Sequence, residues 1–448
     1  MTVTNVLTQP PGSGLQAFDG LAKDWYGKLW MDHVNKTVEV LKFLGKVRGR
    51  MGGRRVLNAV IDELPQSAGF ANQEYHDFMA PSTTSSFQPE LIARSLYTIL
   101  QWTGEVEDAA RAGDKAAFAG PRMTDLKRAR TQYAINKARM AYLGYYQALG
   151  QLSAVAAAPV YTLHPRNDRT SVAASFWKFG THYLRKNMSI QTSATLAGDP
   201  LETTATQERK ITAITRGGGS PTITLDGSIA GDNIDDFIHP WGYVGAELPS
   251  TVGAADEASF FAGPNGLCNL VLDASLYATV YGEARSSRPT LSGQRVNNLG
   301  TAEAYDELMA SLLIDIIADD GTGDEPDVFL IHRSTRREVL KDNKGDRRFA
   351  PVQTESGHGR LTFIAGDTPI PWHTDRDCPP GMIWALRKGT LGTLMNRPLA
   401  SIDKAPERFV RNKDARQIVM AERFNTFCSE PLNNGAREDI QFDVGAVI

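Results

Sequence analysis

Residues 56–104 constrain the fold of this chain more than any other part, because they have too little apolar surface to bury themselves. Residues 55–61 (RVLNAVI) and 93–102 (ARSLYTILQW) have the composition of two strands. The stretch between them is rich in Gln, Ser, Thr, Asn and Pro, and irregular stretches of this length are uncommon in compact domains and usually functional. We expect its aromatic side chains to lie against a neighbouring subunit, with a poorly ordered surface loop as the alternative. These aromatic residues are Phe70, Tyr75, Phe78 and Phe87.

Residues 124–152 are predicted to form the longest helix, with Thr124 as its N-cap and Asp125 in its first turn. At 1.5 Å per residue this helix would be about 40 Å long, enough to support other elements along its length. Apolar residues cover a broad part of its surface, and most of its charges are positive. The positive face is either solvated or a binding surface. Its candidate binding residues are Lys127, Arg128 and Arg130.

The N-terminal residues 23–55 are basic, with nine Lys and Arg against three acids, a local net charge of 9 − 3 = +6. Apolar residues at helical spacing also occur within residues 21–50. This segment is either the solvated face of a helix or an arm that touches a polyanion or an acidic partner. The residues proposed for that contact are Lys42, Lys46, Arg48, Arg50, Arg54 and Arg55.

The later parts of the chain mix strands and helices. Residues 160–265 are rich in strands and turns, with a hairpin formed by residues 210–215 and 221–225 around a glycine run. Helices are predicted over 302–317 and 334–340. A buried strand is expected at 328–331, and further strands at 361–364 and 382–386. Helices and strands joined by tight connections predict an α/β or α+β layer.

Composition excludes several classes of protein. The 448 residues contain 48 Lys and Arg and 51 Asp and Glu, a net charge of −3, which excludes a globally basic nucleic-acid binder. The three cysteines lie far apart, which excludes a C-x-x-C site and fits free thiols in a reducing compartment. The sequence shows no secretory signal pattern and no apolar run long enough for a bilayer. We therefore expect a soluble protein made in the cytoplasm, without membrane contact.

No set of catalytic residues emerges from the sequence. The glycine run at 217–219 precedes a strand rather than a helix, and the nucleotide-binding, zinc-protease and α/β-hydrolase motifs do not occur. A hydrolase would depend on the carboxylate pairs Asp226/Asp232 or Asp375/Asp377. The acids around residue 230 do not have EF-hand spacing, so an acidic turn is preferred to a Ca²⁺ site. We expect no catalytic, metal-binding or cofactor-binding residues, no cofactor and no enzyme activity.

The order of the parts is itself informative: a basic arm, a two-stranded excursion, a long helix, a β-rich segment, a mixed core and returning strands. This order, over residues 20–448, resembles the major capsid protein of tailed bacteriophages, the Hong Kong 97-type fold. Each pattern is loose by itself, and their order carries more weight. The segments that carry the resemblance are RSLYTILQWTGEVEDAARAGDKAAF (94–118), YYQALGQLSAV (145–155), PDVFLIHRSTRREVLKDNKGDRRF (326–349) and GRLTFIAGDTPIPWHTDRDCPPGMIWALRKGTL (359–391).

The resemblance implies an α+β fold with an N-terminal arm, an extended hairpin called the E-loop, a peripheral (P) domain with a spine helix and an axial (A) domain. This chain would add a β-rich insert to that layout. The implied boundaries are 1–50 for the arm, 51–104 for the E-loop, 105–159 for the P domain, 160–265 for the insert, 266–375 for the A domain and 376–448 for strands that complete both domains.

The resemblance also implies a function. The chain would assemble into hexamers and pentamers of an icosahedral head that encloses double-stranded DNA in the virion, after assembly in the host cytoplasm. Its partners would be other copies of itself, non-specifically bound DNA, and scaffolding, portal and decoration proteins. Some relatives cross-link subunits through an E-loop lysine, but no Lys occurs here between Arg55 and Asp114, so we expect a non-covalent shell. The alternatives are an encapsulin-like cellular shell, another virion protein such as a tail or portal component, and a hydrolase with a β-rich accessory domain.

Overall fold

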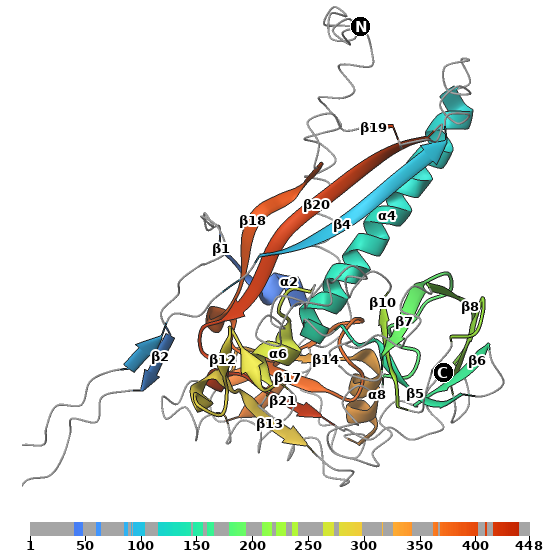
Figure 1. Cartoon of the computed structure of the whole chain (residues 1–448). Helices are drawn as coiled ribbons and strands as arrows, with labels where there is room; N and C mark the ends of the chain where they lie inside the picture. The colour runs from blue at the N-terminus through green and yellow to red at the C-terminus, as the bar shows by residue number, and fades with distance from the viewer. Residues whose placement is uncertain are drawn as a thin grey trace, which may run out of the picture.

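The structure of the chain is a computed structural model. It combines an elongated sheet beside a long helix, a six-stranded sheet and a closed barrel (Figure 1). None of the helices in the described part is long and apolar enough to cross a membrane. The residues that the structure describes are 40–47, 60–63, 85–87, 91, 93–103, 115–144, 147–155, 159–164, 179–193, 208–216, 221–229, 235–240, 263–272, 277–297, 316, 326–342, 362–365, 368–401, 408–409 and 415–438.

The elongated sheet is built around strand β20 (Ala415–Cys428). Strand β4 (Arg94–Thr103) runs antiparallel to one edge of β20, and β18 (Leu391–Ser401) runs antiparallel to its other edge. The strand predicted over 93–102 is therefore confirmed, and its partner comes from near the other end of the chain. Two short strands complete the sheet, β1 (Gly45–Val47), parallel to β18, and β19 (Arg408–Phe409), antiparallel to β20.

The long helix α4 (Lys115–Leu143) lies beside this sheet (Figure 1). The prediction of a long helix is confirmed, but its predicted limits, 124 and 152, are wrong. Gly120 and Pro121 resemble a break in the sequence, yet Pro121 falls in the second turn and removes only one backbone hydrogen bond from a long helix. At the other end Gly144 has a φ of +71°, in the left-handed region that ends helices. The residues predicted as the last helical turns therefore enter a strand.

Six strands close into a barrel in the order β10-β5-β6-β9-β8-β7. Leu152, Tyr161 and Ile211, from three of these strands, are buried. The predicted hairpin is confirmed as β8 and β9, and the β-rich character of residues 160–265 is confirmed for their described part. The barrel begins earlier than predicted, because β5 follows closely on the helix. The strands are β5 (Gly150–Val155), β6 (Val160–Leu163), β7 (Ser189–Ser193), β8 (Arg209–Thr215), β9 (Thr222–Leu225) and β10 (Phe237–Pro240).

The six-stranded core sheet has the order β13-β21-β17-β14-β16-β15. Strands β14 (Val328–Ile331) and β17 (Ile383–Leu386) are buried at every residue, as expected for short apolar runs that are covered on both faces. The strands predicted at or near these positions and near 361–364 are confirmed, as is the short helix, observed as α8 (Arg333–Asp342). The other strands are β13 (Gln294–Asn297), β15 (Thr362–Ala365), β16 (Thr368–Thr374) and β21 (Gly435–Glu438).

Shorter elements join these parts. Strands β2 and β3 pair antiparallel, so the first predicted strand, 55–61, is found at 60–63 within the described residues. The helix predicted over 302–317 lies outside the described residues except for Ile316, which is helical and buried. Cys268, Cys378 and Cys428 are buried and free, as expected. The short elements are α2 (Val40–Phe43), α6 (Leu267–Val271), η4 (Pro289–Leu291), η5 (Lys388–Thr390), η6 (Pro431–Asn433), β2 (Val60–Glu63), β3 (Ser85–Phe87), β11 (Thr279–Val280) and β12 (Glu283–Ala284).

Candidate functional site

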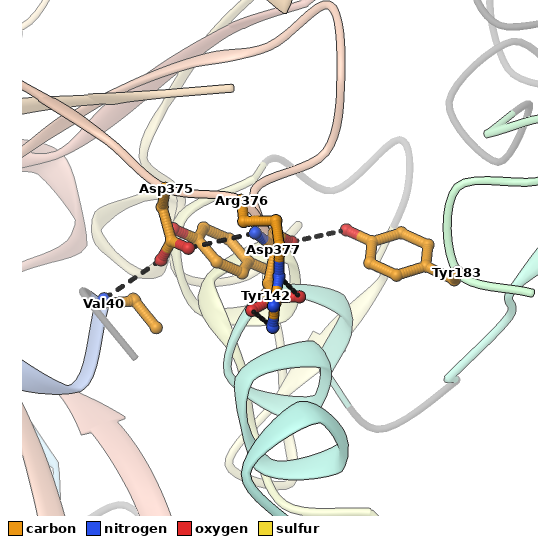
Figure 2. Close-up of polar contacts among 6 residues, drawn as sticks. All are labelled: Val40, Tyr142, Tyr183, Asp375, Arg376 and Asp377. Atoms are coloured by element: carbon orange, nitrogen blue, oxygen red, sulfur yellow. Dashed lines mark hydrogen bonds and ion pairs between the residues drawn. The ribbon is translucent and has the colours of Figure 1, made fainter. Parts of the chain in front are cut away.

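A buried carboxylate, Asp375, joins distant segments of the chain (Figure 2). It follows the last residue of β16, and only 2% of its surface is exposed. Its Oδ2 accepts hydrogen bonds from the backbone N–H of Val40 in α2 at 3.2 Å and from the hydroxyl of Tyr142 in α4 at 2.8 Å. Its Oδ1 accepts the backbone N–H of Asp377 at 3.0 Å. The carboxylate thus fixes the N-terminal segment and the end of the long helix to the core sheet.

Asp377, in the same loop, is also held by structural contacts. Its carboxylate accepts a hydrogen bond from Nη2 of Arg376 at 3.1 Å, and its backbone carbonyl accepts one from the hydroxyl of Tyr183 at 3.0 Å (Figure 2). Burial raises the pKa of Asp375, and its hydrogen bonds to Asp377, Tyr142 and Val40 oppose that rise. The Asp375/Asp377 pair that a hydrolase would need is therefore engaged in holding the fold together.

The second carboxylate pair is not assembled into a site within the described residues. Oδ1 of Asp226 accepts the backbone N–H of Lys210 at 3.0 Å, across the ends of the β8–β9 hairpin. Asp232 lies outside the described residues. No group of three or more His, Cys, Asp or Glu in the described part of the chain is placed to hold a metal ion.

Replacing Asp375 with Ala should lower the free energy of unfolding by about 3 kcal/mol or more, because three buried donors lose their acceptor at about 1–3 kcal/mol each. Asp375→Asn retains one acceptor and should lose less.

Because the folded-state pKa of Asp375 is raised, its protonation favours the folded state. That contribution is present at acid pH and is lost as the pH rises through the folded-state pKa, and the Asn variant should lack it. Urea unfolding of the unassembled chain measures both effects. The matched control is Asp226→Ala, and equal losses in Asp375→Ala and this exposed-site variant would contradict the assignment.

A second buried cluster fixes helix α4 to the elongated sheet. Glu422 of β20, 1% exposed, accepts hydrogen bonds from Nζ of Lys137 at 2.6 and 2.8 Å and from the hydroxyl of Tyr133. The Lys137 ammonium also lies over the ring of Phe424, 4.7 Å from its centroid. Tyr133 and Lys137 are one helical turn apart and so share a face of α4. Burial, followed by the charge of Glu422, raises the pKa of Tyr133, so its hydroxyl stays protonated and donates.

The opposite face of the elongated sheet carries two exposed apolar side chains on β4. Leu96 pairs with Glu422 and faces the helix, so Tyr97 and Ile99 face away from it. They are 52% and 61% exposed and are the large hydrophobic side chains that stand out as exposed in the described part of the chain. Their cross-strand partners, Ala421 and Val419, are buried, so the exposed part of this face lies on β4. Arg423, on the same face of β20, is exposed beside them.

A single covering layer buries only one face of a strand. A strand that is apolar on both faces therefore leaves one apolar face uncovered. The helix covers Leu96 and Leu100, and nothing in the described part covers Tyr97 and Ile99. The sequence signal was present, because the run SLYTIL has no polar face, but the residues 93–102 were interpreted only as a strand. This open face, defined by Tyr97, Ile99 and Arg423, is a surface that another polypeptide can cover.

The residues proposed from the sequence are only partly described. Lys42 is exposed in α2, Arg128 is exposed on α4, and Arg130 is half-buried there with its Nε buried and without a hydrogen-bond partner. The backbones of Lys46, Phe87 and Lys127 lie in β1, β3 and α4, and their side chains lie outside the described part. The remaining proposed residues, Phe70, Tyr75, Phe78, Arg48, Arg50, Arg54 and Arg55, lie outside the described residues.

Sequence reasoning missed the importance of Lys137. It is one of the positive residues of the predicted helix and was given no separate role, although it is 6% exposed and paired with Glu422. The available signal was its position: Lys137 is four residues after Tyr133 and three before Met140, within the apolar surface. A lysine at such a position predicts a buried acid on the element that packs against the helix.

No family model and no curated protein matches the chain. Among solved structures, a chain of the cyanophage A-1(L) capsid matches it with a TM-score of 0.51 and 10% identity, over 90% of this chain and 93% of that one. The chain has the fold of a phage capsid protein. Two weaker likenesses to capsid structures are also found. For the capsid of a native GTA particle the TM-score is 0.41 at 10% identity, covering 90% of each chain. For phage G major capsid and decoration proteins it is 0.38 at 8% identity, covering 89% of this chain and 88% of that one. The resemblance inferred from the order of the parts is thus confirmed at the level of the capsid fold.

Proposed function

We propose that this chain is the major capsid protein of a tailed bacteriophage and assembles into the hexamers and pentamers of an icosahedral head around double-stranded DNA. The observation that carries the proposal is the likeness to the A-1(L) capsid chain, which extends over 90% of this chain and 93% of that one. The polar clusters around Asp375 and Glu422 agree with a structural role, because their groups hold segments together. Neither an encapsulin-like shell nor a hydrolase is favoured by any of these observations.

In this proposal each part of the fold has a place in the capsid subunit. Helix α4 and the sheet of β4, β18 and β20 form the P domain with its spine helix, and the core sheet forms the A domain. The barrel of β5 to β10 is the insert that this chain adds. Residues 1–50 form the arm, whose basic residues, with those of α4, contact packaged DNA or a scaffolding protein in the assembling virion.

The open face of β4 is the proposed site at which one subunit receives residues 56–93 of the next, the part of the proposed E-loop that precedes β4. Between Val56 and Ala93 the sequence has five acidic residues and no Lys or Arg, so this segment is negatively charged and carries isolated aromatics. The open face offers the complement, two exposed apolar side chains beside Arg423. A contact of this kind needs no covalent cross-link, in agreement with the lack of lysine in the segment. The five acids are Asp62, Glu63, Glu74, Asp77 and Glu90.

Replacing Phe70, Tyr75 and Phe78 together with Ser should strongly weaken assembly and leave the isolated chain folded, because the three rings would contribute buried area only at the subunit contact. Light scattering as a function of protein concentration measures the concentration at which particles form, and circular dichroism checks the fold. The conservative variant Phe70→Leu/Tyr75→Phe/Phe78→Leu should assemble nearly normally. Normal assembly of the Ser variant at low concentration would contradict the proposed contact.

The proposed function itself is tested by the size of the particles that the unmodified chain forms. Sedimentation of the expressed chain, alone and co-expressed with a scaffolding protein, should yield closed particles or rings. A chain that stays a monomer or dimer under both conditions would contradict the function.

A further inference from the structure

The barrel and the core sheet are joined at a contact that gathers positive charge. The segment 179–188, which leads into β7 of the barrel, lies against the loop that follows β16. The hydroxyl of Tyr183 donates to the backbone carbonyl of Asp377 (Figure 2). The ring centroids of His182 and His332 lie 4.8 Å apart. These contacts bring basic residues from two parts of the fold together. We call the four of them the basic seam: Arg185, Lys186, Arg216 and Arg376.

The basic seam has more cationic side chains than acidic partners among the residues that the structure describes. Arg376 is 52% exposed and pairs with Asp377, the carboxylate of the same loop. Arg185 is half-buried, and its Nε is buried without a hydrogen-bond partner. Lys186 and Arg216 are exposed. Burial and then the charge of Arg376 lower the pKa of Arg185, Arg216 lowers it further, and Asp377 opposes them. Arg376 and Arg216 are therefore each close enough to Arg185 to oppose its positive charge.

Repulsion among fixed guanidinium groups is relieved by a bound anion, and the planar fork of Arg matches phosphate oxygens. A protein partner would be expected to add an apolar centre to the contact. In the described part, however, the exposed large apolar side chains are Tyr97 and Ile99 on β4, and neither belongs to the seam. A surface of exposed cations without an apolar centre is typical of contact with a nucleic-acid backbone, which is recognised through its charge.

We propose that the basic seam binds the phosphate backbone of duplex DNA, without sequence preference, on the inner side of the shell. This inference rests on the proposed function, because a capsid subunit meets DNA on its inner side. It adds a contact that is separate from the arm and the helix face. It also assigns an orientation to the subunit in the shell, with the junction of the barrel and the core sheet on the inner side.

The test compares two full-length double variants, each lacking two positive charges. Arg185→Gln/Arg216→Gln removes half of the seam and leaves the Arg376–Asp377 pair intact. Lys210→Gln/Arg288→Gln is the matched control outside the seam. Binding of the unassembled chains to a short duplex DNA of mixed sequence is followed by fluorescence anisotropy over a series of KCl concentrations. The seam variant should bind about tenfold more weakly in low salt, and the slope of log K against log[salt] should fall by about 1.8, since each lost phosphate contact removes about 0.9. The control should bind like the unmodified chain.

Several outcomes would overturn the proposal. Equal DNA affinity and salt slope in the seam variant and the control would exclude a seam contact with DNA. If the seam variant binds DNA as well as the unmodified chain but no longer forms shells, the seam is instead a contact between copies of the chain. Light scattering of the same variants distinguishes a failure of the proposed DNA contact from a failure of the proposed function. If shells form but the seam does not bind DNA, only the present inference fails. If the unmodified chain forms no particles, the proposed function fails with it.

Discussion

Replacing Tyr97 and Ile99 together with Thr should raise the protein concentration needed for shell assembly by roughly thirtyfold. Fully burying an aromatic or aliphatic side chain stabilises a contact by about 1.5–3 kcal/mol, and these two are already partly covered, so their loss should cost about 2 kcal/mol per contact. The stability of the unassembled chain should change little, because both side chains are exposed there and Thr retains the preference for a strand. Light scattering against concentration measures the first effect, and urea unfolding measures the second.

The variant Tyr97→Phe/Ile99→Val is the matched control, because it keeps the open face apolar and the strand intact. It should assemble at nearly the concentration of the unmodified chain. The interpretation of the open face is wrong if the Thr variant assembles as readily as this control. It is also wrong if the Thr variant fails to assemble only because the chain has lost stability in urea.

Removing the charge of Glu422 should be the most damaging single change to the stability of the subunit. In Glu422→Gln the Lys137 ammonium stays buried beside a neutral amide, and breaking a buried pair in this way costs about 3–5 kcal/mol. The loss follows because the helix cannot withdraw Lys137 to water without giving up its contact with β20. The free energy of unfolding in urea measures the loss. A similar loss should be absent for Glu430→Gln, an exposed acid near the end of the same strand.

The double variant Lys137→Met/Glu422→Gln removes both charges and keeps an oxygen that can accept the Tyr133 hydroxyl. It should recover most of the stability lost in Glu422→Gln, because replacing both members of a buried ion pair with neutral groups is often close to neutral. Additive losses in the double variant would show that the two side chains do not act as a pair, and would contradict the proposed anchor.

The parts of the fold that could be predicted from sequence are those with a local signal. The glycine run around residue 218 between two alternating stretches indicated the β8–β9 hairpin, and the apolar runs VFLI and IWAL indicated β14 and β17. The long helix was also visible, but its end was not. The left-handed φ at Gly144 stops it, and Gly120, which lies within α4, shows that the residue type alone does not decide where a helix ends.

The parts that could not be predicted depend on contacts between residues far apart in the chain. Lys137 and Glu422 are 285 residues apart, and Val40 and Asp375 are 335 apart, so no local pattern relates them. The same holds for β4 and β20, whose register is set by the whole sheet. The order of the parts resembled a capsid protein strongly enough to predict the fold. The open face of β4 could not be predicted either, because the sequence does not show which side of the strand the helix covers.

Electron microscopy of the purified chain tests the central claim most directly. The account predicts closed shells, or rings of five and six subunits, formed by the chain alone or with a scaffolding protein. In a reconstruction of such particles, Tyr97 and Ile99 should lie under residues 56–93 of a neighbouring subunit. A uniform population of monomers or dimers at high concentration, unchanged by co-expression with a scaffolding protein, would contradict the assignment of this chain as a capsid subunit.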